Sequence, residues 1–186
     1  MGNRRLGRKR LYGIEKEGQA VDLGAGTGIR DAIVSTTQHR LGQELITEIV
    51  VDLGTSKATI IGGGGDTQAV GVSGKPAQLC RLTRAKVGIV TEIRAILTEV
   101  AVGGNTVLDM EMSAAIVNTG GSPGTALGDI HTLAAIGQDA SYTTDADAAA
   151  DDYLYITNGS GSSSAEMTAG KLIIYIYGFA VPDDLV

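Results

Sequence analysis

Two glycine-rich segments of similar sequence carry the residue types in this chain that could support catalysis. Residues 20–28 read AVDLGAGTG, and residues 50–59 read VVDLGTSKAT. In each segment an aspartate precedes glycine (three glycines in the first segment, Gly54 alone in the second), and glycine lets a backbone approach a ligand closely. Either segment could therefore hold a nucleotide-like cofactor, provided that its flanking elements are those that such a loop requires.

The first segment resembles the S-adenosylmethionine loop of class I methyltransferases. Asp22, Gly24, Gly26 and Gly28 match the pattern D-x-G-x-G-x-G. That family also has an acidic residue about 20 positions further on, which binds ribose hydroxyls as in dinucleotide folds. Asp52 lies 24 residues beyond Gly28. The resemblance implies a small S-adenosylmethionine-dependent methyltransferase, which stays open as an alternative.

The surroundings of the first segment favour a purely structural turn. A cofactor loop follows an apolar strand, but IEKEGQ (14–19) precedes this one. The chain after Asp52 should enter a helix and instead reads GTSKATIIGGGG (54–65). A glycine-rich motif outside a strand–loop–helix context is weak evidence of binding. We therefore expect a glycine turn between short strands.

The second segment is similar to the first phosphate-binding loop of the actin and sugar-kinase superfamily. Members of that superfamily close two large α/β domains on ATP, whereas only 132 residues follow Gly54 here. The chain is too short for the second half of such a site. We predict a hairpin turn at residues 54–56 and no common function for the repeated VDLG.

An acidic stretch, TTDADAAADD (143–152), is the one candidate cation site. Calcium prefers several carboxylate and carbonyl oxygens, and this stretch offers four carboxylates, from Asp145, Asp147, Asp151 and Asp152. The spacing differs from that of an EF-hand loop, and the turn glycine is missing. A solvated acidic loop is the favoured interpretation, and whether it binds a cation stays open.

Cysteine and histidine are too scarce for other common sites. The single cysteine, Cys80, excludes an internal disulfide, and with His39 and His131 it gives too few ligands for a zinc site. We predict that Cys80 is a small core residue and that both histidines have no catalytic role. The sequence thus predicts a protein that is not an enzyme, with no catalytic residues, no metal site and no cofactor.

The composition is that of one β-rich domain. The chain has 186 residues, 43% hydrophobic residues, 27 glycines and 4% aromatic residues, so its core must be mainly aliphatic. So many glycines, without the period of collagen, indicate many turns. The longest apolar runs fall short of a membrane span, and the basic N-terminus lacks the apolar region of a signal peptide. We expect no membrane partner and synthesis in the cytoplasm.

The charge is unevenly distributed. Residues 1–18, MGNRRLGRKRLYGIEKEG, contain six cationic residues and two glutamates, a net charge of +4, whereas the whole chain carries −6. A basic arm on an acidic body suggests an acidic binding partner or nucleic acid. The arm residues that we predict to bind a partner are five cations and two apolar anchors: Arg4, Arg5, Arg8, Lys9, Arg10, Leu11 and Tyr12.

Hydrophobic periodicity predicts an all-β fold. Period-two or β-branched runs indicate strands at residues 45–53, 57–61, 68–73, 86–102, 106–117, 152–159 and 170–181. The last run is apolar on both faces, which predicts that both faces are covered. Residues 28–43 could form a helical turn or two, and residues 122–140 a short helix. We expect a jelly-roll-like β-sandwich, with an extended arm (1–18), one domain (19–186) and at most two short helices.

The two ends of the chain resemble small structural proteins of tailed bacteriophages. The resemblance rests on the opening MGNRRLGRKRLYGIEKEG and the closing DDYLYITNGSGSSSAEMTAGKLIIYIYGFAV. Among these proteins the chain is most similar to the capsid decoration, or cement, proteins of marine phages. The resemblance implies a jelly-roll body, often a homotrimer, at the joints between subunits of the major capsid protein on the outside of the virion.

In that resemblance the basic arm reaches over the shell to capsid carboxylates, and nucleic acid is not a partner. A coat or spike subunit is the nearest alternative, and its arm would face inward onto nucleic acid. Strongly salt-dependent nucleic-acid binding through residues 4–10 is the property that would favour this alternative.

Overall fold

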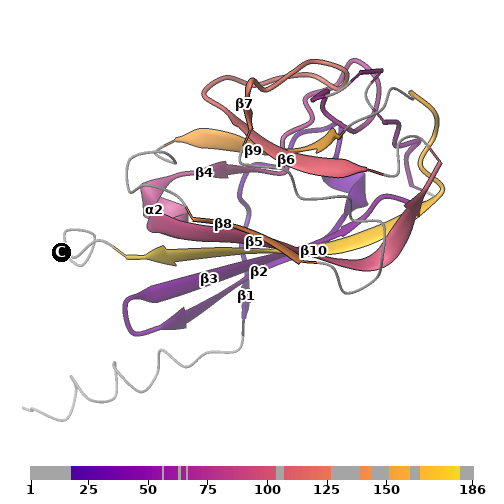
Figure 1. The fold of residues 1–186 in the computed structure, drawn as a ribbon. Helices are drawn as coiled ribbons and strands as arrows, with labels where there is room; N and C mark the ends of the chain where they lie inside the picture. The colour runs from indigo at the N-terminus through magenta and orange to yellow at the C-terminus, as the bar shows by residue number, and fades with distance from the viewer. Residues whose placement is uncertain are drawn as a thin grey trace, which may run out of the picture.

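The computed structural model describes residues 18–55, 57–62, 64–65, 67–103, 107–126, 139–143, 151–159 and 164–180. In this part of the chain two antiparallel sheets lie one above the other, as Figure 1 shows. The predicted all-β sandwich is confirmed. The seven arm residues predicted to bind a partner, Arg4 to Tyr12, lie outside the described residues.

The larger sheet has six strands and the smaller has four. In spatial order the larger sheet contains β1 (Gln19–Ala20), β2 (Ile33–Leu41), β3 (Glu44–Asp52), β10 (Ala169–Phe179), β5 (Ile89–Val102) and β8 (Asp139–Thr143). The smaller sheet contains β4 (Cys80–Leu82), β9 (Asp152–Asn158), β6 (Leu108–Ser113) and β7 (Thr125–Ala126). A 3₁₀ turn, η1 (Arg30–Ala32), and a one-turn helix, α2 (Arg84–Val87), complete the described elements.

The core lies between the sheets and is aliphatic, as the composition predicts. In β3 and β10 every second residue is buried, among them Ile49, Val51, Leu172 and Ile174. Leu154 of the smaller sheet joins them in the same cluster. Burying each such side chain stabilises the fold by about 1.5–3 kcal/mol, so this interdigitated layer is the main source of stability.

Strand pairing follows a nested pattern. The antiparallel pairs β3 with β10, β4 with β9, β5 with β8, and β6 with β7 join early strands to late ones in mirror order. Two further antiparallel pairs, β10 with β5 and β9 with β6, complete the two sheets. These pairs form one antiparallel ribbon, with β3 to β6 along one side and β10 to β7 along the other. The ribbon is wrapped so that successive pairs belong alternately to the larger and the smaller sheet.

Of the helical turn or two predicted in residues 28–43, the structure has one, the 3₁₀ turn η1, and most of the remaining residues form a strand. After η1, the residues from Ile33 onward form β2, which returns as β3 through a turn at Gly42 with φ 64°. Four of the five residues from Ile33 to Thr37 are β-branched and lose less side-chain freedom in a strand than in a helix, and β3 supplies the pairing partner.

Two predicted short strands are isolated bridges instead. In residues 57–61 only Ile61 pairs, with Gly71 and Glu166, and in residues 68–73 Ala69 pairs with Thr157. No described hairpin follows the turn predicted at residues 54–56, because the next strand begins at Cys80. The short helix predicted within residues 122–140 rests on residues 127–136, which lie outside the described part, and β7 and β8 border that stretch at residues 126 and 139.

Two strands are shorter than predicted. The run 86–102 begins in α2 and becomes a strand at Ile89, after Gly88 with φ 71°. The run 106–117 ends as a strand at Ser113, whose side-chain oxygen accepts a hydrogen bond from the amide of Ala115 and so turns the chain. That strand is also buried on its polar face, since Glu111 is only 2% exposed.

Candidate protein-binding face

The glycine loop at residues 22–28 is filled by the protein itself. The amide of Gly26 donates a hydrogen bond to the carbonyl oxygen of Gln78 at 2.8 Å, and that of Gly28 donates to Pro76 at 2.6 Å. A Cβ atom at either glycine would collide with the Pro76 carbonyl. These glycines allow two backbone segments to touch, and the amides that a cofactor phosphate or carboxylate would need are already used.

The repeated VDLG forms the same local turn at both positions. Asp22 accepts a hydrogen bond from the amide of Gly24 at 2.8 Å, and Asp52 accepts one from Gly54 at 3.1 Å. Both are Asx-type turns, in which a carboxylate satisfies the backbone amide two residues on. The leucine between them is buried in each copy, Leu23 at 3% and Leu53 at 0% exposure. The repetition has a structural cause.

The remaining polar candidates that the structure describes are not gathered into a site. His39 is exposed on β2, while His131, Asp145 and Asp147 lie outside the described residues. Asp151 forms a 3.7 Å ion pair with Arg81, and the pKa of Asp152 is raised by burial and by the charge of Asp151. Among the described residues no group of three or more His, Cys, Asp or Glu could hold a metal ion. Within the same residues, no helix has the length and apolarity needed to cross a bilayer.

Cys80 is a core residue, as expected, and burial raises the pKa of its thiol to about 12. The unfolded chain releases the thiol proton near pH 9 and the folded chain does not. Stability should therefore fall as pH rises above about 9, by about 1.4 kcal/mol per pH unit from this group. The difference in unfolding free energy between the natural protein and Cys80→Ala, measured by urea titration at pH 8 and pH 10.5, should show this slope. A constant difference would contradict it.

The outer face of the smaller sheet is covered by irregular chain. Tyr155 on β9 is fully buried there and packs with Ala69 and Ala77. Its hydroxyl accepts a hydrogen bond from the amide of Val117 at 2.9 Å and donates one to the carbonyl of Ala115 at 3.1 Å. The segments around residues 69–77 and 115–117 thus form a lid on this sheet.

The outer face of the larger sheet remains half-exposed and carries large apolar side chains. On its central strand, Ile173, Tyr175, Tyr177 and Phe179 point away from the core, since the residues between them are buried. Cross-strand neighbours extend this surface, which we call the outer face: Leu41, Ile46, Val50, Ile89 and Ile96. Phe179 is 43% exposed and Leu41 59%.

Carboxylates surround the aromatic side chains of the outer face. The registers of β3 and β5 against β10 place five acidic residues and two cations on it: Glu44, Glu48, Asp52, Glu92, Glu99, Arg94 and Lys171. Lys171 lies 3.4 Å from Asp52 and 3.2 Å from Glu99, so one of the cations is already paired twice. The pKa of Tyr175 is raised by partial burial and by the charge of Glu48. The surface is apolar in the middle and acidic overall.

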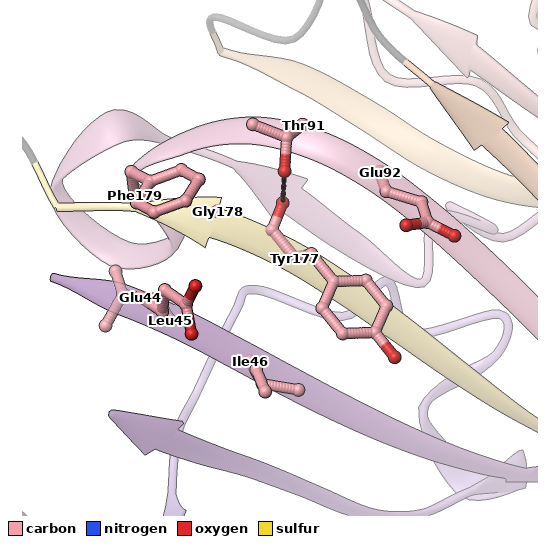
Figure 2. A pocket seen from close by; sticks show the side chains of 8 residues that line it. All are labelled: Glu44, Leu45, Ile46, Thr91, Glu92, Tyr177, Gly178 and Phe179. Atoms are coloured by element: carbon pink, nitrogen blue, oxygen red, sulfur yellow. Dashed lines mark hydrogen bonds between the residues drawn. The ribbon is translucent and has the colours of Figure 1, made fainter. Parts of the chain in front are cut away.

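A pocket of about 320 Å³ opens at one end of this surface. Figure 2 shows its lining side chains, which come from β3, β5 and β10. Glu44 and Glu92 supply carboxylates to it, and Tyr177 and Phe179 supply aromatic rings. Thr91 donates a hydrogen bond to the Tyr177 carbonyl at 3.3 Å, where the pairing of β5 and β10 changes register. A cationic or aromatic side chain is the kind of group that this lining suits.

The outer face corrects one prediction from the sequence. The two apolar faces of residues 170–181 predicted a strand covered on both sides, but the face with Tyr175 and Tyr177 is only partly buried. The sequence does contain a sign of this exposure in residues 44–52, where Glu44, Glu48 and Asp52 lie on the face opposite to the buried residues. A strand that shows carboxylates on one face indicates that the neighbouring strands meet solvent on the same face.

No family model, curated protein or solved structure matches this chain.

Proposed function

We propose that this protein is a capsid decoration protein of a tailed bacteriophage, a structural component that binds the major capsid protein on the outside of the virion. The observation that carries the proposal is the nested strand pairing. The pairing of β3 to β6 with β10 to β7, wrapped into two sheets, supports the jelly-roll connectivity that belongs to the proposal. The jelly roll is common in viral capsid and lectin domains. The strand connectivity therefore supports the same function as the resemblance of the two chain ends.

The outer face of the larger sheet supplies a surface for such binding. Exposed aromatic and aliphatic side chains that gather on one surface are more common at protein interfaces than on the rest of a protein's surface. Tyr175, Tyr177 and Phe179 form the apolar centre, with carboxylates around them. A standard interface buries about 800 Å² on each partner, which a six-stranded sheet can provide. In the proposal this surface docks on a capsid subunit while the arm binds capsid carboxylates.

Attachment through several protomers at once lets weak contacts of each protomer hold the protein on the capsid. A homotrimer presents three arms and three outer faces together, so binding of one protomer raises the effective concentration of the others. A trimer is accordingly part of the proposal, and native mass spectrometry of the purified protein measures it directly.

Quantitative mass spectrometry of purified particles tests the function itself. We expect a copy number relative to the major capsid protein that is set by the lattice, near one or a simple fraction of one. Absence of the protein from particles would overturn the proposal and would favour the methyltransferase alternative.

Neutralising the arm tests how the protein attaches. With Arg4, Arg5, Arg8, Lys9 and Arg10 all replaced by glutamine, we expect capsid affinity to fall at least about tenfold, because charge-assisted hydrogen bonds to carboxylates are lost. The body should stay folded, with a melting temperature within a few degrees of that of the natural protein. The double variant Lys57→Gln/Lys75→Gln removes cations from exposed positions of the body and serves as the control. Unchanged affinity of the arm variant, in sedimentation with particles, would show that the arm is not the anchor.

The coat or spike alternative makes a different prediction for the same protein. An arm that faces nucleic acid would bind DNA with an affinity that falls steeply as salt rises. Fluorescence anisotropy with labelled duplex DNA at 50 and 200 mM salt separates the two functions. We expect no specific or tight binding, because the body of the chain is acidic.

A further inference from the structure

We propose that in the free protein the basic N-terminal segment, residues 1–17, binds across the outer face of the larger sheet of its own chain. The occupant of that surface is therefore part of the same polypeptide. This inference concerns the isolated protein and does not depend on the proposed function.

Charge complementarity is the first argument. Residues 1–17 contain six cations and two glutamates, whereas the outer face presents five carboxylates and two cations. Lys171 is already engaged by Asp52 and Glu99. Glu44, Glu48 and Glu92 are then the carboxylates directly opposite the aromatic residues of β10, with Arg94 opposite Tyr175 as the other cation, so the surface around the aromatic centre stays net negative. The sign and the number of charges on the segment suit this surface.

The place where the described chain begins is the second argument. Gly18 lies against the ring of His39, close enough that a Cβ on Gly18 would come within 2.6 Å of it. β1 pairs antiparallel with β2, with Gln19 opposite Gln38. Gly18, the point at which residues 1–17 are attached, therefore lies on the side of β1 that faces the end at which Leu41 and Phe179 are exposed, which is also the end that holds the pocket.

The segment is long enough to cross the surface. From β2 to β5 there are three interstrand spacings, about 14 Å in all. Seventeen extended residues span up to about 55 Å. Because the segment is tethered at the edge of the sheet, its effective concentration at the surface is high, on the order of millimolar, and individually weak contacts are enough to hold it.

The chemistry of the pocket identifies its occupant as an arginine. Glu44 and Glu92 offer carboxylates to a guanidinium, and Tyr177 and Phe179 offer ring faces on which it can stack. Apolar groups of the segment, such as Leu11 and Tyr12, suit the aliphatic part of the surface around Ile46.

A second copy of the same face is a poorer occupant. A symmetric face-to-face dimer would set each acidic surface against its equal, and like charges in an interface cost binding energy. The basic segment avoids this repulsion. If the protein is a decoration protein, the capsid carboxylates compete with the outer face for the same arm, so that attachment would free the arm and uncover the face together.

Charge reversal in the full-length protein tests the inference. In Glu48→Lys/Glu92→Lys we expect trypsin to cleave after the arginines of residues 4–10 about tenfold faster than in the natural protein, as followed by mass spectrometry. The variant Glu48→Gln/Glu92→Gln gives an intermediate rate and guards against misfolding of the reversed form. The matched control Asp31→Lys/Glu166→Lys reverses two exposed charges elsewhere and should leave the rate unchanged. Equal rates in all variants, or equal acceleration by the control, would overturn the proposal.

A spin label distinguishes binding within one chain from binding between chains. Cys80 is buried, so Asn3→Cys provides the one reactive thiol expected in the full chain. We expect the label to broaden the amide signals of Tyr175 and Tyr177 when label and ¹⁵N are on the same chain. In a mixture of spin-labelled chains and ¹⁵N chains we expect no broadening. Broadening in the mixture would assign the arm to a second copy, and broadening in neither sample would remove it from the face.

Discussion

Gly26→Val should lower the free energy of unfolding by at least about 3 kcal/mol, the range of severe core and backbone substitutions. Gly26 is buried against the chain at Pro76, and a Cβ there would overlap the Pro76 carbonyl oxygen. Neither backbone can withdraw easily, because the Gly26 amide donates to Gln78 and the Gly28 amide donates to Pro76. Urea unfolding measures the loss.

A neighbouring substitution serves as the control for Gly26→Val. Thr27 is exposed in the same loop, so Thr27→Val adds a similar side chain without the collision and should change stability by less than about 0.5 kcal/mol. A Gly26→Val protein as stable as the natural one would show that the two segments do not touch in solution.

This result also decides how the methyltransferase alternative has to be tested. A valine at Gly26 would remove cofactor binding in a methyltransferase, but here it would unfold the loop with or without a cofactor. Calorimetric titration of the unmodified protein with S-adenosylmethionine is the informative experiment. We expect no binding, because the loop amides are already paired. A Kd below about 100 μM, or about −5.5 kcal/mol, would mean that the loop opens to admit the ligand.

The alternation of side chains accounts for what could be predicted of the fold. A strand buried on one face shows its period in the sequence, so β3, β5, β6, β9 and β10 were all found within a few residues of their bounds. The β2 strand was missed because Ser, Thr, Gln, His and Arg occupy both of its faces, so it shows no apolar period. Only two of its residues pair with β1, and most of its side chains are half-exposed. Its pairing with β3 decides its conformation, and pairing is a property of two segments.

The outer face could be predicted only in part for a related reason. Tyr175 and Tyr177 are visible in the sequence as an apolar second face, but their exposure depends on which chain segments cover which sheet. The smaller sheet is covered by segments near Ala69, Ala77 and Val117, which look like ordinary turns in the sequence. Nothing local distinguishes a segment that lies on one sheet from a segment that could lie on the other.

Tyr155→Ala is the second substitution with a large expected effect, about 3–5 kcal/mol of destabilisation. Tyr155 is fully buried on the outer face of the smaller sheet, between β9 and the lid formed by the irregular segments. Removing the ring leaves a cavity, and it also leaves the Val117 amide and the Ala115 carbonyl without the hydroxyl that joins them.

The conservative variant separates these two causes. Tyr155→Phe keeps the ring and removes only the hydroxyl, so it should cost about 1–3 kcal/mol, the penalty for leaving buried polar groups unsatisfied. Tyr153→Phe is the control, since Tyr153 is half-exposed on the same strand and should cost under about 0.5 kcal/mol.

If Tyr155→Phe were as stable as the natural protein, the hydroxyl would not hold residues 115–117. The lid would then depend on packing alone, and hydrogen exchange at the Val117 amide would be fast in both proteins. We expect instead that this amide is protected in the natural protein and exchanges at least about tenfold faster in Tyr155→Phe, because the bond is lost at that one position.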